Sequence, residues 1–552
     1  MGKEVPPSEE PLTPADTPQA FVRHSAVMSV GTALSRVTGF VRLAAMAYAL
    51  GVTESRLADA FNVANTTPNM VYDLALGGII SSVFIPVFVE RMERGSREEA
   101  WHTARSVLTF SFLLLSAIAL LAILFSRQII DLYTAGVPAG SQRAAERALA
   151  SVFLKWFMPQ IVFYGLGAGV ATGLLNAHRR FAAPMFAPIV NNLIATATFL
   201  AFFLVPGARH GTVGITNTQR AILSIGTTLG VVGMTVVLWP SLRRLGFRWR
   251  FTLDFHDPGF RRVGRLAGWA FVYAGINQLG LLVIIVLAGR VRGGYTAYQS
   301  AFIFFQLPYA IFAVSIMTAL LPSLSSRWSA GDRDTFRAQL SRGIRGTAFI
   351  VVPAAFGYLA LAAPIVALLL QRGVMGEAST DLLASVLQVF SIGLFSFCVF
   401  QLELRAFYAM QDTRTPALIN LFAVGINTVA DLIFVRSFKV EGLALGHATA
   451  YTFAAITAAV ILRRRLGGLE GRRLGLALAQ IGLGGALAGA AAFGVSRAVA
   501  AMLGTASRGA QVLQVGGGVA AGVAVFLGTA IAFRMPELAL VRRMVAERRR
   551  RA

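Results

Sequence analysis

Two arginines lie within the first long apolar segment of the chain, residues 24–50. Arg36 is near its middle, and Arg42 follows less than two helical turns later. At 100° per residue, Ser35, Gly39 and Arg42 share one narrow helical face, with Arg36 beside it. A central arginine costs a membrane helix about 2.5–3.5 kcal/mol on insertion scales. Because guanidinium groups form paired hydrogen bonds with phosphate, this face predicts a water-filled, anion-binding cavity.

The second apolar segment, residues 58–89, carries two aspartates. Asp59 lies near one end and Asp73 near the middle, and we expect Pro68 to interrupt the helix between them as a hinge or gate. Asp73 is placed to pair with Arg36, which would lower the cost of burying the arginine, or to relay charge. The alternative for the arginines is that Arg42 extends to the membrane surface and Arg36 forms a purely structural ion pair.

An oxygen pair lies in the segment at residues 416–436. Asn427 and Asp431 are four residues apart, on one helical face at membrane depth. Such oxygen ligands suit a cation such as Na⁺ or a proton-carrying group, although a buried contact between helices explains the pair equally well. We find no enzyme constellation and expect no cofactor. With Cys398 the only cysteine, we predict no disulfide framework and no firm metal site.

The elements that must position these residues are membrane helices. Hydrophobic residues make up 56% of the 552, and only 14% are charged, whereas soluble domains have about 25% charged residues. This excludes a soluble nucleic-acid binder despite the net charge of +24. The sequence predicts an all-α polytopic membrane protein with about fourteen spanning helices. We place these near residues 24–50, 58–89, 105–126, 152–175, 184–205, 220–240, 264–289, 296–322, 346–370, 382–409, 416–436, 441–462, 474–496 and 511–533.

The basic residues predict the orientation. Of the 50 lysines and arginines, 33 fall in one alternate set of loops and in the tails, and 13 in the other set. The richer set is expected on the cytoplasmic side, with both termini of this multi-pass cell-membrane protein. The closing arginine run, residues 548–551, is then expected to touch anionic lipid headgroups rather than nucleic acid.

Two stretches of the chain resemble each other. Residues 177–184 link the fourth and fifth segments, and residues 409–416 link the tenth and eleventh, each running from alanine to proline. An offset of six segments predicts two parallel six-helix lobes followed by two further helices, a common transporter design, unless the likeness is chance. We predict a disordered tail at 1–22, an N-lobe at 23–240, a C-lobe at 241–465, helices thirteen and fourteen at 466–534, and a basic tail at 535–552.

Several motifs resemble the MurJ (MviN) family of lipid II flippases. They are residues 35–42 (SRVTGFVR), 58–61 (ADAF), Pro68-Asn69, 175–188, 321–325 and 407–416 (FYAMQDTRTP). The resemblance implies the fold of the multidrug/oligosaccharidyl-lipid/polysaccharide exporter superfamily. It also implies alternating-access transport of undecaprenyl-diphosphate-linked peptidoglycan precursor to the outer leaflet for cell-wall synthesis. In the family's pattern, Arg36 and Arg42 match arginines of the central cavity, and Asp59 matches an aspartate of the second span, with Ser35 and Gly39 as the small residues beside the arginines. Asn69 and Asp73 complete the set of residues that we predict to bind the substrate.

The chain departs from this family at three positions. Many members have arginine where this chain has Tyr72 and Ile303, and some have an acid at Ile284 that completes a cation site with Asn427 and Asp431. Two alternatives therefore remain: an exporter of another lipid-linked saccharide or a drug, and a cell-wall scaffold that transports nothing. The partners implied are lipid II, anionic membrane lipids and cell-wall synthesis proteins, with Na⁺ or H⁺ as the coupling ion.

Overall fold

Helices are the only regular elements in the part of the chain that the structure, a computed structural model, describes. That part is residues 18–74, 85–94, 97–178, 180–206, 214–505 and 507–538. Within it, nine helices are long and apolar enough to cross a membrane, or ten if the bent pair α16 and α17 is one span. The all-helical membrane fold is confirmed. The count of fourteen stays a prediction, and the tails 1–17 and 539–552 lie outside the described residues.

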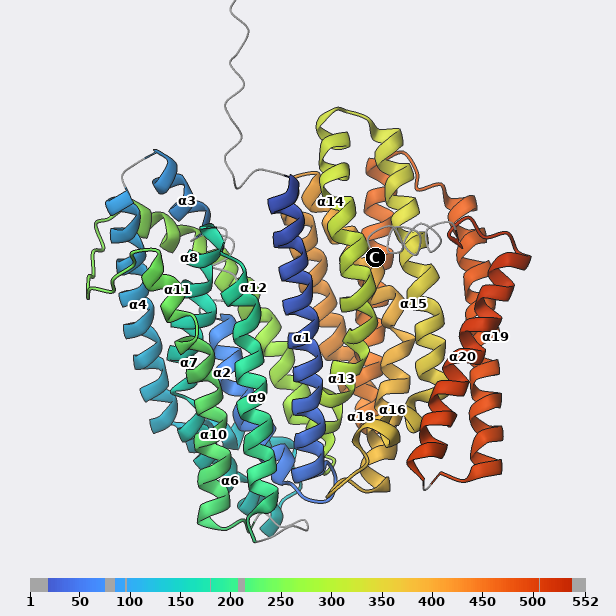
Figure 1. Cartoon of the computed structure of the whole chain (residues 1–552), viewed down its shortest axis with the longest axis horizontal. Coiled ribbons are helices and arrows are strands. Elements are labelled where there is room, and N and C mark those ends of the chain that lie inside the picture. Colours follow the sequence, from blue (N-terminus) through green and yellow to red (C-terminus); the bar gives the residue numbers. More distant parts are fainter. Residues whose placement is uncertain are drawn as a thin grey trace, which may run out of the picture.

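The N-terminal half of the chain forms the blue-to-green group of helices in Figure 1. A π-helix, Tyr164–Ala171, joins α7 to α8 within one long apolar rod. The helices of this half are α1 (Pro18–Leu50), α2 (Leu57–Tyr72), α3 (Ile85–Arg94), α4 (Arg97–Leu124), α5 (Ser126–Tyr133), α6 (Ser141–Phe157), α7 (Gln160–Phe163), α8 (Thr172–Ala177), α9 (Ala182–Leu204), α10 (Asn217–Val236) and α11 (Trp239–Arg244).

The C-terminal half forms the light-green-to-red group. Its helices are α12 (Pro258–Ala288), α13 (Gly294–Pro308), α14 (Val314–Ser329), α15 (Arg333–Leu370), α16 (Glu377–Ile392), α17 (Leu394–Ala409), α18 (Arg414–Arg465), α19 (Gly471–Leu503) and α20 (Arg508–Ala532). A π-helix, Tyr309–Ala313, joins α13 to α14 directly after Pro308, whose missing N–H removes one α-helical hydrogen bond.

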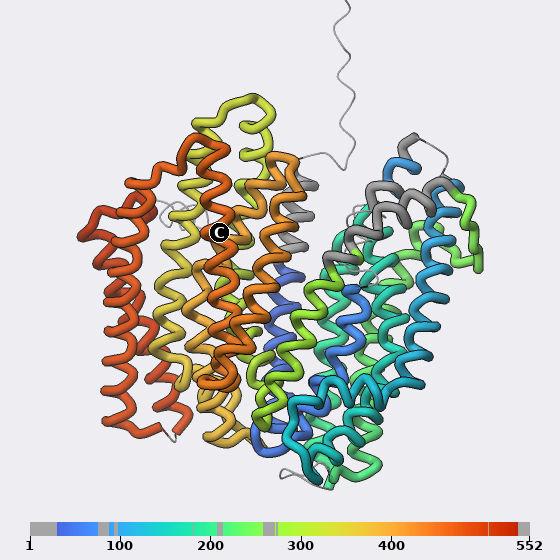
Figure 2. The backbone as a smooth tube through the Cα atoms, turned by 180° about the vertical axis from the view of Figure 1, so that it is seen from behind, coloured from blue at the N-terminus to red at the C-terminus, as the bar shows by residue number. Residues whose placement is uncertain are grey.

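Most helix packing occurs within each half of the chain. α1 packs along α9, α9 along α10, and α2 along α6, whereas α12 and α17 pack against α18, and α13 against α16. α19 and α20 pack on each other and on α15, at the edge of the molecule in Figures 1 and 2. The predicted lobe boundaries at residues 240 and 465 stay predictions, although α1 lies between the two groups of helices in Figure 1.

The two repeated stretches form the same turn. In the first, the Arg180 N–H donates to the Leu175 carbonyl at 2.8 Å. In the second, the Asp412 N–H donates to the Phe407 carbonyl at 3.0 Å. These donors and acceptors occupy equivalent places in the two stretches. Each turn ends one long helix and starts the next, so the sequence repeat corresponds to a repeat of backbone structure.

The prediction that Pro68 interrupts its helix is wrong. α2 continues through Pro68. Proline leaves one carbonyl in the preceding turn without its usual donor. The hydroxyls of two neighbouring threonines donate to carbonyls of that turn. Thr66 donates to the Asn62 carbonyl at 2.8 Å, and Thr67 donates to the Val63 carbonyl at 3.3 Å. Pro68 is buried here and is not a break between the two aspartates.

α18 is a helical hairpin rather than one rod. Lys439 has non-helical dihedral angles, φ 51° and ψ −126°, inside the predicted linker at 437–440. A Cβ at Gly442 would lie 2.6 Å from the Phe434 carbonyl oxygen, so the turn needs glycine there. The two ends of α18 meet again where Arg465 pairs with Asp412 at 2.6 Å. The predicted eleventh and twelfth segments are therefore antiparallel neighbours.

Candidate functional site

A cavity of about 280 Å³ brings the two arginines together. Arg36, Gly39 and Arg42 all line it from α1. Arg36 is exposed and Arg42 is half-buried, so both guanidinium groups are open to a ligand. The rest of the polar lining is neutral and comes from α2, α9 and α13: Asn62, Asn65, Asn192, Gln299, Ser300 and Gln306. The arrangement places neutral amides around two positive charges, which is chemically suited to a small anion.

Contacts with α9 fix the rotation of α1. The Asn192 amide donates to the Ser35 carbonyl at 3.1 Å and to the Thr38 hydroxyl at 3.2 Å. A Cβ at Gly39 would lie 3.5 Å from the same amide nitrogen, an ordinary contact. Ser35 is thus bound by α9 through its backbone and does not line the cavity, whereas Gly39 does.

The predicted pairing of Asp73 with Arg36 is not present. Among the described residues Asp73 makes no ion pair, and it follows α2 as an exposed side chain. Arg36 is exposed as well, so neither side chain is buried against the other. The two positions at which many family members have arginine lie in different surroundings. Ile303 lines the arginine cavity, whereas Tyr72 packs against Tyr164 with ring centroids 5.7 Å apart.

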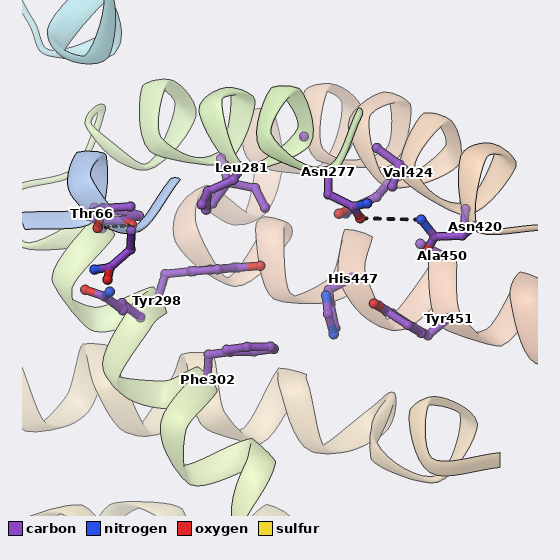
Figure 3. A pocket seen from close by; sticks show the side chains of 17 residues that line it. Thr66, Asn277, Leu281, Tyr298, Phe302, Asn420, Val424, His447, Ala450 and Tyr451 are labelled. Carbon is purple, nitrogen blue, oxygen red and sulfur yellow. Dashed lines mark hydrogen bonds between the residues drawn. The ribbon is translucent and has the colours of Figure 1, made fainter. Parts of the chain in front are cut away.

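A second cavity, of about 400 Å³, lies between α2, α12, α13 and α18 (Figure 3). Asn69 lines it, so this predicted site residue is separated from the arginines. In Figure 3, Asn277 and Asn420 are joined by a hydrogen bond of 3.4 Å. Gln299 lines both cavities, which are therefore neighbours.

The predicted cation pair is formed but lacks further acidic partners. The Asn427 amide donates to Asp431 at 3.0 Å, and Asp431 is buried against Gly446 of the other arm of the hairpin. Ile284 lines the second cavity together with Asn427 and offers no oxygen. Within the described residues, no three acidic, histidine or cysteine side chains gather into a metal-binding group. Asn427 and Asp431 therefore supply two of the ligands that the resemblance implies, and Ile284 stands where the acidic ligand would be.

Asp59 lines neither cavity. It is buried where α2 begins, and its carboxylate accepts three hydrogen bonds from the start of α13 and the residue before it. Oδ2 receives the Gly293 N–H at 2.7 Å, and Oδ1 receives the Thr296 N–H and hydroxyl at 3.0 and 2.8 Å. Its role in the structure is to join the two halves of the chain.

Further contacts close the same end of the molecule. Glu54 accepts hydrogen bonds from the Gly376 N–H and the Ser379 hydroxyl, each at 2.7 Å. Arg56 forms a buried ion pair with Glu146 at 3.1 Å and also donates to the Gly289 carbonyl at 3.3 Å. Loops from both halves thus meet at this end, where α1 ends near the bottom of Figure 1. The predicted topology assigns these loops to the outer side.

The sequence-based search missed the amides. Asn62 and Asn65 line the arginine cavity, and together with Asn69, which was predicted, they recur every three or four residues along α2. A stripe of amides in an apolar helix is the signal that would have identified them, because unpaired amides are costly in hydrocarbon. Gln299 and Gln306 on α13 form the opposite wall of the arginine cavity.

Comparison with known proteins identifies the family. The model of the family "Lipid II flippase MurJ" matches residues 46–509, most of the chain, starting after the two arginines. A probable lipid II flippase MurJ of Rhizobium meliloti is 28% identical over 425 residues, which are 77% of each chain. One of Rickettsia prowazekii is 29% identical over 427 residues, 77% of this chain and 80% of the relative.

Solved structures share the fold. A lipid II flippase MurJ in an inward closed conformation superposes with a TM-score of 0.74 at 22% identity, covering 92% of this chain and 99% of that one. An inward-facing multidrug transporter of the MATE family superposes with a TM-score of 0.61 at 16% identity, covering 78% and 95%. Together with the match over residues 46–509, this places the chain in the family of the lipid II flippase MurJ.

Proposed function

We propose that this protein moves lipid II from the inner to the outer leaflet of the cytoplasmic membrane by alternating access, for cell-wall synthesis. Family membership supports the substrate. The observation that carries the proposal is that Arg36 and Arg42 line one cavity within an otherwise apolar helical protein. Two guanidinium groups at membrane depth are retained only where an anion or a structural partner compensates them.

The diphosphate of the substrate is the anion that this cavity suits. Each guanidinium can donate two parallel hydrogen bonds to phosphate oxygens, and the surrounding amides add neutral donors. The apolar side chains Val37 and Val41 lie beside the arginines on α1 and are exposed. The long lipid tail, which needs a ~30 Å hydrocarbon environment, is therefore placed along α1 in the bilayer while the headgroup enters the cavity.

Alternating access requires the closed end to open. In the proposed cycle, the contacts of Asp59 with Thr296 and of Glu54 with Ser379 hold the outer end shut while the headgroup binds from the cytoplasmic side. Separation of the two halves breaks these contacts and releases the headgroup outside. Buried hydrogen bonds of this kind are suited to a two-state gate, because each is made fully or lost.

The proposed function also includes an orientation of the protein in the membrane and a set of partners. The excess of basic residues in one set of loops supports cytoplasmic termini, with the basic tails on anionic lipids. Proteins of cell-wall synthesis that receive the substrate are the expected partners outside the membrane. Coupling to Na⁺ or H⁺ is assigned to Asn427 and Asp431. No step of the cycle is routed through an ion, because Ile284 supplies no third ligand.

Reconstitution tests the proposal against its alternatives. The purified protein is placed in lipid vesicles with fluorescent lipid II, and an impermeant quencher reports the fraction in each leaflet. Translocation that is faster than in protein-free vesicles, and that is not inhibited by a cationic drug, supports the proposal. Transport of the drug alone would identify a drug exporter. Movement of neither compound, by protein that is folded and inserted, would identify a scaffold.

A further inference from the structure

The second cavity is lined by amides and aromatic rings rather than by charges. At about 400 Å³ it lies within the size range of small-molecule sites. None of its described lining residues is a lysine, arginine, aspartate or glutamate. Its polar lining consists of Thr66, Asn69, Asn277, Gln299, Asn420, Asn427 and His447, and its rings are those of Tyr295, Tyr298, Phe302 and Tyr451.

This lining restricts the chemistry of a ligand. Amide side chains offer donors and acceptors side by side, which match vicinal hydroxyl and acetamido groups. Flat aromatic faces match the apolar C–H faces of a pyranose ring. A lipid chain would place apolar groups against the polar side chains of the lining, and a phosphate would meet no cation. The ligand class that satisfies both parts of the lining is a neutral carbohydrate.

His447 supplies an unsatisfied polar atom at this cavity. Its side chain is 7% exposed, and its Nε2 atom has no hydrogen-bond partner among the described residues. Figure 3 shows the imidazole between Phe302 and Tyr451, whose ring centroid lies 4.5 Å away. Buried polar atoms of folded proteins are nearly always paired, so an unpaired nitrogen on a residue that lines the cavity points to a partner supplied by a ligand.

The second cavity lies next to the arginine cavity. Gln299 lines both of them. Along α2, Asn62 and Asn65 line the arginine cavity, and Thr66 and Asn69 line the second one, all at helical spacing. A ligand with an anionic group and an attached sugar can therefore occupy both.

We propose that the second cavity is a carbohydrate subsite, which binds the sugar part of the headgroup while Arg36 and Arg42 bind its diphosphate. This inference rests on the proposed function. It assigns the arginines to the part of the substrate shared by all lipid diphosphates. It assigns His447 and Asn420 to selection for the sugar. A site built to pair buried polar groups discriminates strongly against ligands that lack the matching group.

Binding of two ligands by purified protein in nanodiscs tests the subsite. Lipid II carries the sugars, and undecaprenyl diphosphate has the same lipid and diphosphate without them. We expect His447→Leu and Asn420→Leu each to weaken lipid II binding about tenfold and to leave undecaprenyl diphosphate binding unchanged. His447→Gln, which keeps a hydrogen-bonding group, should restore most of the loss. Thr449→Val, on an exposed position of the same helical arm, is the matched control.

The two ligands also separate the possible failures. If wild-type protein binds both ligands equally, or if both leucine variants lose affinity for both ligands in parallel, the subsite is overturned. Arg36→Gln should weaken both ligands together, whatever the fate of the subsite. If wild-type protein binds neither ligand, the proposed function itself fails. Binding of undecaprenyl diphosphate also reports whether a variant is folded. Asn420 is half-buried, so Asn420→Leu still tests the subsite if His447→Leu does not fold.

Discussion

Asp59 and Thr296 join the two halves of the protein. Oδ1 of Asp59 accepts both the backbone N–H and the side-chain hydroxyl of Thr296, at 3.0 and 2.8 Å. Both residues are buried, and the Gly293 N–H donates to the other carboxylate oxygen. Since a carboxylate that receives three hydrogen bonds is held strongly in place, this contact connects the two halves across the closed end.

Thr296→Val should weaken that connection without changing the shape of the side chain. Losing a hydrogen bond to a buried carboxylate costs about 1.5–3 kcal/mol, which favours separation of the two halves. Spin labels at the exposed positions Gln142 and Glu377 would report the separation as a larger fraction of long distances between the two labels. Labelling is specific because the one cysteine, Cys398, is buried.

The matched control for this change is Thr318→Val. Thr318 is exposed and donates only to a carbonyl of its own helix, at 2.8 Å. It should leave the distance distribution as in the wild type. An unchanged distribution for Thr296→Val would show that the Asp59 contact does not hold the closed end.

Gly446→Ala should destabilise the α18 hairpin. A Cβ at residue 446 would collide with the Asp431 carboxylate and would contact the Asn427 amide at 3.2 Å. Overpacking of this kind costs about 1–3 kcal/mol, so the midpoint of thermal unfolding in detergent should fall. Gly425→Ala on the same helix meets nothing within 4 Å and should raise stability by about 1 kcal/mol. Equal midpoints for the two variants would refute this view of the hairpin.

The pairing of Asp412 with Arg465 predicts a pH dependence. Burial raises the pKa of Asp412, but hydrogen bonds from Thr415 and the charge of Arg465 outweigh it and hold the pKa at about 2. Because this value is below the ordinary 3.8, the pair contributes stability above pH 4 and loses it as the pH falls toward 2.

Asp412→Ala tests that pH dependence. At neutral pH it should lower stability by about 0.5–1 kcal/mol, since the pair is partly exposed. The difference from the wild type in thermal midpoint should shrink as the pH falls below 4. A difference that stays constant down to pH 2.5 would mean that the charge of Asp412 contributes nothing.

Most of the fold could be predicted from the sequence because the length of an apolar segment and the charge of a loop are local signals. The linker around Lys439 was predicted from the ends of two apolar segments, and the repeated link at residues 409–416 from its likeness to residues 177–184. The site was predicted less well, because it depends on which helical faces meet. Among the described residues Asp73 forms no ion pair with Arg36, and Asp59 binds the opposite half of the protein. No pattern within one segment shows which residues of another segment lie opposite.

The family's missing arginine at Ile303 can be restored. Ile303 lines the arginine cavity and is 37% exposed, so a guanidinium at this position has room and access to water. Ile303→Arg should tighten undecaprenyl diphosphate binding about tenfold through a charge-assisted hydrogen bond. Ile303→Gln is the neutral control and should change binding little. Weaker binding by the arginine variant would place the diphosphate elsewhere.

The central claim is that Arg36 binds the diphosphate during transport. The direct measurement is the initial rate of lipid II translocation in vesicles for Arg36→Ala, compared with Arg497→Ala at an arginine that contacts only Phe493 of its own helix among the described residues. Loss of a charge-assisted hydrogen bond predicts a rate about tenfold to a hundredfold lower for Arg36→Ala. The control should match the wild type. A wild-type rate for Arg36→Ala, at equal insertion, would contradict the account.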